Sequence, residues 1–158
     1  MGNRIVIAVD GSEAARDAAR FAIGLAGRLG LGLAALRVVD VDRYASEFEA
    51  VRETVTRELE AGAEKILAEV RDLAREAGLD LEPVVRHGDS SREIIRYAQE
   101  NLDVVLIVLG ASGRRRLGRQ MIGSTAERVV RQVARDLPCP VLVAPSRSSM
   151  PEARLDLD

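Results

Sequence analysis

Two kinds of hydrophobic pattern alternate along this chain, and the alternation limits the folds it can form. Runs of apolar residues that predict buried strands occupy positions 4–10, 33–39, 81–87, 104–110 and 140–144. The segments between them carry apolar residues at steps of three and four, the spacing of an amphipathic helix. Alternating strands and helices predict an α/β fold in which a parallel sheet carries helices on both faces.

Local signals mark where the helices begin and end. Ser90 with Glu93, and Ser124 with Glu127, match the capping box, in which each side chain bonds a free main-chain N–H of the first turn. They predict that Ser90 and Ser124 cap their helices, and Pro138 should end the last one. The helical segments are expected at residues 13–30, 48–77, 90–102 and 124–137.

The composition of the strands indicates their order. Residues 5–9 and 104–109 are apolar throughout, as a strand covered on both faces requires, whereas 81–87 contains charged residues and a proline, which an edge strand tolerates. The first and fourth strands are therefore expected side by side in the centre of the sheet. Their connections then diverge and leave a crevice at the carboxyl ends, with Asp10 and Gly110 at its edge.

Composition argues against several classes of function. The net charge is −2 over 158 residues, so we expect no binding to nucleic acid or to an anionic membrane. The first apolar run is too short for a signal peptide or a membrane span, which predicts a soluble cytoplasmic protein. Cys139, the single cysteine, cannot form an internal disulfide and is expected to be a small buried side chain. His87, the single histidine, has no evident catalytic or metal-binding partners.

Glycines surround the predicted start of the last helix. Gly110 ends the fourth strand, Gly113 follows, and Gly123 with Ser124 opens the helix. Glycine allows positive φ angles and a close approach of main-chain N–H groups to a ligand, and a helix start adds free amides and the positive end of its dipole. The segment therefore predicts a phosphate cradle. It is not a Walker loop, because the only lysine is Lys65, inside the longest helix.

The spacing of these glycines resembles a known motif. Gly110-x-x-Gly113, nine residues, then Gly123-Ser124 is similar to the G-2x-G-9x-G(S/T) pattern of the ATP-binding branch of the universal stress protein family. The resemblance extends to the opening IVIAVDGSEAA, to RVVD, to HGD and to CPVLVAP. It implies one Rossmann-like domain of the adenine nucleotide alpha hydrolase type over residues 1–145, with five parallel strands in the order 3-2-1-4-5. Residues 146–158 remain as a polar C-terminal tail.

The resemblance also implies a role for individual residues. Asp10 matches an aspartate near the nucleotide, where it would face the ribose hydroxyls or a Mg²⁺ ion bound to the phosphates. Val38 matches the residue whose main chain meets adenine. Independently of the resemblance, Arg114 is a candidate to face the phosphates, because a guanidinium donates hydrogen bonds to phosphate oxygens in a fork. The other matching positions are Ala8 and Ser12 at the pocket wall, Leu109, Gly110 and Gly113 at the ribose and phosphate turn, and Gly123, Ser124 and Thr125 at the phosphate-binding helix start.

Several functions remain open at this point. The first is a regulatory stress-response module that binds ATP, or ADP or AMP, with Mg²⁺, and whose loop at 111–122 becomes ordered on binding. The second is a slow ATPase on the same site, although no general base is evident in the sequence. A phosphoacceptor receiver domain is a third, and it would need a lysine after the last strand, which reads PVLVAPS. The fourth is a degenerate member that acts only through protein contacts.

The last strand also suggests a partner. It begins at Pro140 and ends at Ala144, is apolar on both faces, and should nevertheless lie at the edge of the sheet. Proteins normally avoid such an exposed edge. The pattern predicts a homodimer in which two copies meet through this strand, as the resemblance also implies.

Overall fold

A computed structural model describes residues 2–44, 48–111, 115–116, 119–120 and 122–146. Five strands form one sheet: β1 (Arg4–Ala8), β2 (Gly32–Val39), β3 (Leu81–His87), β4 (Val104–Gly110) and β7 (Val141–Ala144). They lie in the order β3-β2-β1-β4-β7, and every neighbouring pair is parallel. Because β7 is the fifth strand of this sheet, the predicted order 3-2-1-4-5 is confirmed.

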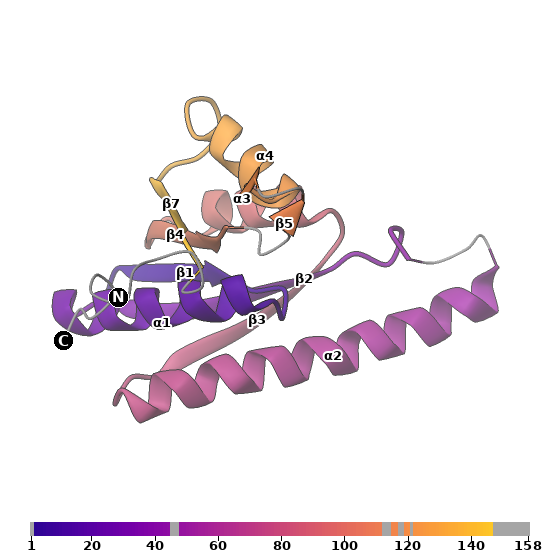
Figure 1. The fold of residues 1–158 in the computed structure, drawn as a ribbon, viewed down its shortest axis with the longest axis horizontal. Coiled ribbons are helices and arrows are strands. Elements are labelled where there is room, and N and C mark those ends of the chain that lie inside the picture. Colours follow the sequence, from indigo (N-terminus) through magenta and orange to yellow (C-terminus); the bar gives the residue numbers. More distant parts are fainter. Residues whose placement is uncertain (1, 45–47, 112–114, 117–118, 121, 147–158) are drawn as a thin grey trace.

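Helices cover both faces of this sheet (Figure 1). One face is covered by α1 (Glu13–Leu29) and the 28-residue α2 (Glu49–Glu76), the other by α3 (Ser90–Glu100) and α4 (Ser124–Gln132). The central strand β1 serves both layers, since Ile5 and Ile7 pack toward α1 and Val6 packs toward α3. All three side chains are at most 1% exposed, which is why positions 5–7 of this strand are apolar.

Both predicted capping boxes are wrong. The N-cap of α3 is Asp89, whose Oδ1 accepts hydrogen bonds from the Arg92 N–H (3.0 Å) and the Ser91 hydroxyl (2.7 Å). Ser90 is instead the first helical residue. An N-cap needs extended backbone, and Asp89 has it at φ −69° and ψ 130°. A carboxylate one residue earlier thus supplies the acceptor that the sequence pattern assigned to serine.

The start of α4 differs in the same way. Gly123, which has no side chain, is the N-cap, with φ −60° and ψ 151°, and no side-chain cap hydrogen bond forms among the described residues. Ser124 is the first helical residue, and Glu127 pairs with Arg131 at 2.7 Å rather than reaching back to the cap. The first turn of α4 therefore keeps main-chain N–H groups without a side-chain acceptor.

The last helix is also shorter than expected. It ends at Gln132 rather than near residue 137, and the chain continues as a turn in which the N–H groups of Arg135 and Asp136 both donate to the Gln132 carbonyl. The connection from β4 to α4 contains a two-residue antiparallel hairpin that the sequence did not predict, formed by β5 (Arg115–Arg116) and β6 (Arg119–Gln120).

Two further expectations concern the core and the membrane. Cys139 is 7% exposed in the cluster beneath α3 and α4, and burial raises the pKa of its thiol, so its role as a small buried side chain is confirmed. Within the described residues, no helix combines the length and the apolar character that crossing a membrane requires.

Candidate functional site

A pocket of ≈ 680 Å³ lies at the carboxyl ends of the central strands. This is the position of the crevice that the strand order predicts. Nine of the residues singled out in the sequence line it together: Ala8, Asp10, Ser12, Val38, Leu109, Gly110, Gly123, Ser124 and Thr125. The other two, Gly113 and Arg114, lie outside the described residues.

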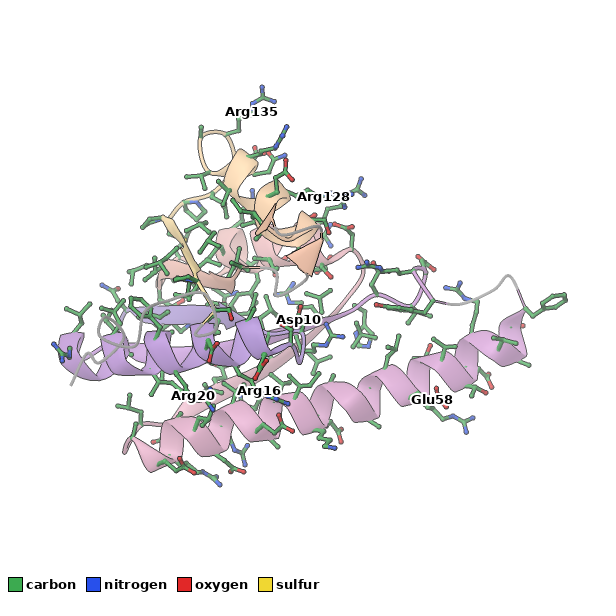
Figure 2. All side chains as sticks on the ribbon, in the orientation of Figure 1. Asp10, Arg16, Arg20, Glu58, Arg128 and Arg135 are labelled. Carbon is green, nitrogen blue, oxygen red and sulfur yellow. The ribbon has the colours of Figure 1, made fainter. Side chains whose placement is uncertain are left out.

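The turn between β1 and α1 forms one polar side of the pocket. Asp10 Oδ1 accepts a hydrogen bond from the Ser12 N–H (2.9 Å), and Gly11 between them has a φ of 82°, in the left-handed region that favours glycine. Ser12 then caps α1, since its hydroxyl oxygen accepts from the Ala15 N–H (3.1 Å). The Asp10 carboxylate stays exposed beside the start of α1 (Figure 2), so it serves the turn and remains accessible to a ligand.

Gly110 shapes the wall between β4 and α1. A Cβ at this position would lie 2.6 Å from the carbonyl carbon and oxygen of Ala14 and 2.9 Å from the Ala15 nitrogen. Neither Gly110 nor Gly123 has a positive φ, so the backbone conformation at these two positions does not itself require glycine. Close packing on α1 is the structural reason for glycine at position 110.

Three helices contribute their first turns to this pocket, and they differ in how they are capped. Ser12 caps α1 and Asp89 caps α3, whereas no side chain in the described part of the chain caps α4. The first turn of α4 offers free N–H groups together with the hydroxyls of Ser124 and Thr125, both of which line the pocket. An anion at this helix start would satisfy those groups and interact favourably with the helix dipole.

The inner wall of the pocket is apolar. Leu36, Val38, Ile94 and Leu109 line it and are each at most 4% exposed. They belong to the hydrophobic cluster between the sheet and α3, which fixes their positions. A flat apolar group such as a nucleobase would find contact on this wall, and the polar groups described above would lie beside it.

The end of β2 also offers main-chain groups. The last hydrogen bond between β2 and the β1 segment joins the Val9 N–H to the Leu36 carbonyl at 3.0 Å. Alternation along the strand turns the main chain of Val38 toward the same side, where β1 has already ended at Ala8. Among the described residues, no main-chain bond from Val38 crosses to that side. The N–H and C=O of Val38 are thus directed toward the pocket.

Sequence reasoning missed several lining residues. Arg43 and Tyr44 come from the connection after β2, Ser90 and Ile94 come from α3, and Glu13 comes from the first turn of α1. The rule that strand ends gather at one edge could have identified Arg43 and Tyr44, because they follow the carboxyl end of β2. The contribution of α3 depends on how that helix packs and has no local signal.

His87 lies away from this pocket, at the end of β3. Its Nε2 is 3.0 Å from Oε1 of Glu60, so it pairs with α2. Among the residues that the structure describes, no three His, Cys, Asp or Glu side chains are grouped to hold a metal ion.

Comparisons of the sequence and of the structure with known proteins identify the same family. The universal stress protein family model matches residues 1–145. A universal stress protein of Methanocaldococcus jannaschii is 33% identical over 141 residues, which is 89% of this chain and 80% of that protein.

Solved structures extend the comparison. The universal stress protein UspA of Lactobacillus plantarum superimposes with a TM-score of 0.75 at 30% identity, over 89% of this chain and 96% of that one. A universal stress protein of Archaeoglobus fulgidus, solved in complex with dAMP, shares the fold with a TM-score of 0.65 at 22% identity, over 89% and 96% of the two chains. By its family match, its sequence relatives and its fold, this chain belongs to the universal stress protein family.

Proposed function

We propose that this protein binds an adenine nucleotide in the pocket at the carboxyl ends of β1 and β4, with the phosphates at the start of α4. The observation that carries the proposal is the uncapped first turn of α4, which faces a pocket whose other two helix starts are capped. Free N–H groups at a helix start and two adjacent hydroxyls are suited to phosphate oxygens. The dAMP complex of the Archaeoglobus relative supports the choice of an adenine nucleotide.

The base would occupy the apolar end of the same pocket. The N–H and C=O of Val38 form a donor and an acceptor that suit the polar edge of adenine. Leu36, Ile94 and Leu109 supply the contact surface. Ala8, Asp10 and Ser12 would then lie between base and phosphates, where a carboxylate accepts hydrogen bonds from ribose hydroxyls.

ATP with Mg²⁺ is the form of the ligand that we propose. We propose that the phosphates supply most ligands of the ion and that Asp10, one of two exposed carboxylates lining the pocket with Glu13, is the protein ligand. The glycine motif of the ATP-binding branch supports ATP over the monophosphate. Gly113 and Arg114 remain proposed phosphate contacts from its undescribed part.

The biological role we propose is regulatory: nucleotide binding would signal to a partner in a stress response, with ordering of the loop at 111–122 as the signal. Slow hydrolysis is the second candidate, because Glu13 places a carboxylate in the pocket that would orient a water molecule. Measuring the release of phosphate from ATP distinguishes the regulatory role from slow hydrolysis. A turnover number above about 1 per second, within the usual range of enzymes, would favour the hydrolase.

Calorimetric titration of nucleotide-stripped protein with ATP and Mg²⁺ tests the binding itself. We expect micromolar affinity, and its loss in Gly123→Val, where a branched side chain stands at the mouth of the first turn. The φ and ψ of Gly123 are those of ordinary extended backbone, so this variant should fold. If wild-type protein binds neither ATP nor ADP nor AMP, the proposal fails.

The remaining proposals concern assembly and setting. We propose a homodimer formed through β7 and a domain that spans residues 1–145, followed by a polar C-terminal tail at 146–158. We also propose a cytoplasmic location, where adenine nucleotides are made and used. The three partly buried residues of β7, Val141, Leu142 and Val143, support the dimer, because an apolar edge strand is a preferred site for pairing with another chain.

A further inference from the structure

We propose that Tyr44, backed by the guanidinium of Arg43, stacks on the nucleobase and determines affinity for the base of the ligand. The proposal rests on the proposed function, since it assigns the base end of the same pocket. Both residues line the pocket and belong to the connection that leaves β2. This connection starts directly after Val38 and Val39, so the ring lies on the side of the pocket where we place the base.

Local hydrogen bonds fold this connection into a defined turn. The Arg43 N–H donates to Oδ1 of Asp40 (3.2 Å), and the Tyr44 N–H donates to the carbonyl of Val41 (3.0 Å). The Asp40 side chain thus replaces a main-chain acceptor, a common way for aspartate to stabilise a turn. Arg43 and Tyr44 are positioned by these bonds at the carboxyl edge of the sheet.

An ion pair then connects the turn to α2. Asp42 lies 2.6 Å from the guanidinium of Arg52, which is in the first turns of that helix. Both side chains are substantially exposed, so the pair adds little stability, although it joins the turn to α2. Tyr44 thus follows a turn with its own hydrogen bonds and stays exposed.

The exposure of Tyr44 is what a ligand would explain. Tyr44 is 61% exposed, although it lines a pocket and belongs to a chain with only two tyrosines, two phenylalanines and no tryptophan. The other tyrosine, Tyr97, is 4% exposed in the core. A half-open aromatic ring beside an apolar pocket wall offers a stacking face that the aliphatic residues of that wall do not supply.

The contact with Arg43 adds to this stacking surface. The guanidinium carbon lies 5.8 Å from the centroid of the Tyr44 ring, within the range of a cation–π contact. A planar cation on one face of the ring leaves the other face for a base. Stacking on an aromatic ring tolerates different bases, so this contact should strengthen binding of purine nucleotides in general, while the main chain of Val38 selects adenine.

Tyrosine fluorescence tests the stacking directly, because the chain has no tryptophan. In Tyr97→Phe, Tyr44 is the only tyrosine, and saturating ATP should quench most of its emission. In Tyr44→Phe, the buried Tyr97 is the only reporter, and ATP should leave its emission nearly unchanged. Equal responses in the two variants would overturn the proposal.

Affinity measurements separate base from phosphate recognition. We expect Tyr44→Ala to lower the affinity for ATP at least tenfold, which is about the size of the loss when a stacking ring is removed. Tyr44→Phe should retain wild-type affinity. Inorganic tripolyphosphate, which has no base, should compete with ATP for wild-type protein and bind Tyr44→Ala equally well. An equal loss for ATP and tripolyphosphate would show that the ring acts on the phosphates and would overturn base stacking.

The two proposals fail in distinguishable ways. If Tyr44→Ala binds ATP as tightly as wild type, stacking is wrong and nucleotide binding stands. If wild-type protein binds no nucleotide, both proposals fall. Phe48→Ala is the matched control, since Phe48 is 75% exposed on the same connection, does not line the pocket, and should leave ATP affinity unchanged.

Discussion

Gly110 and Ala14 touch through their main chains, with the end of β4 so close to the first turn of α1 that a Cβ on Gly110 would lie 2.6 Å from the Ala14 carbonyl. Neither partner can move away easily, because β4 is a central strand and α1 is capped at Ser12. This contact forms the floor of the pocket at the point where β1 and β4 diverge. It therefore joins the stability of the fold to the shape of the site.

Replacement of Gly110 tests this contact. Gly110→Ala should lower the free energy of unfolding by about 1–3 kcal/mol, since the added methyl group meets rigid backbone. Gly24→Ala is the matched control: Gly24 lies inside α1 with nothing within 4 Å of its Cβ position, so alanine should raise stability by about 0.5–1 kcal/mol. Urea unfolding measures both. A neutral Gly110→Ala would contradict the close packing.

At the start of α4, a substitution that adds a side-chain cap should stabilise the fold and weaken nucleotide binding. In Gly123→Asp, the carboxylate would cap the first turn and raise the free energy of unfolding by roughly a few tenths of a kcal/mol. The same carboxylate would occupy the N–H groups that we assign to phosphate and repel its charge, so ATP affinity should fall at least tenfold. Calorimetry with a parallel urea titration measures the two effects. Unchanged ATP affinity would exclude the start of α4 as the phosphate site.

The cap of α3 should depend on pH. The hydrogen bond from Ser91, and then the one from the Arg92 N–H, lower the pKa of Asp89 below its ordinary value of 3.8. A carboxyl group whose pKa is lowered by folding stabilises the protein above its unfolded pKa, and this stabilisation is lost as the pH falls through the folded pKa. Asp89→Ala should therefore cost about 1 kcal/mol at neutral pH and progressively less below about pH 4.

Two variants check that Asp89 is the capping residue. Asp89→Asn should keep most of the stability at neutral pH, because asparagine also caps helices. Since the asparagine amide does not ionise, the contribution of this cap to stability should not change as the pH falls below about 4. Ser90→Ala should change stability little, since Ser90 is the first helical residue rather than the cap. A larger cost for Ser90→Ala than for Asp89→Ala in urea unfolding would restore the capping box.

The proposed dimer can be tested at the free edge of β7. The carbonyls of Pro140 and Ala144 accept bonds from the β4 side, so alternation directs the main chain of Val143 toward the open edge. Val143→Pro should keep the monomer fold and abolish dimerisation, because proline removes the N–H that a partner strand would use. Sedimentation velocity measures the mass, and circular dichroism checks the fold.

The neighbouring position supplies the control. The main-chain N–H and C=O of Leu142 are directed toward β4. Leu142→Pro should therefore disrupt the sheet and lower the free energy of unfolding strongly. A wild-type protein that sediments as a monomer at all concentrations would exclude the dimer. A dimer that persists in a folded Val143→Pro variant would show that another surface forms it.

Much of the architecture could be predicted because its causes are local. Residues 5–9 and 104–109 are apolar throughout, and such strands are stable only between two helix layers, so their central position follows from composition. Once they are neighbours, the crevice at their carboxyl ends is a consequence of chain direction. Nine of the residues singled out in the sequence line that pocket for this reason.

The predictions that were wrong concern helix capping and, like the structural role of one glycine, they depend on tertiary packing. Ser90 and Ser124 satisfy the capping pattern, but an N-cap is defined by extended backbone, and the packing of α3 and α4 gives that backbone to Asp89 and Gly123. The sequence indicated a need for glycine at position 110, which was attributed to the conformational freedom of glycine and to a close approach to a ligand. The structural reason is the main chain of Ala14, almost a hundred residues earlier and visible only when β4 lies against α1.

The sequence by itself determined the fold class, the order of the strands and the edge at which the site forms, because periodicity and strand composition are local properties of the chain. Only the tertiary structure decided which helix start is uncapped, why Gly110 must be glycine, and that Arg43 and Tyr44 line the pocket. These features depend on which segments, distant in sequence, are brought into contact. That choice is made by the packing of the whole core rather than by any single segment.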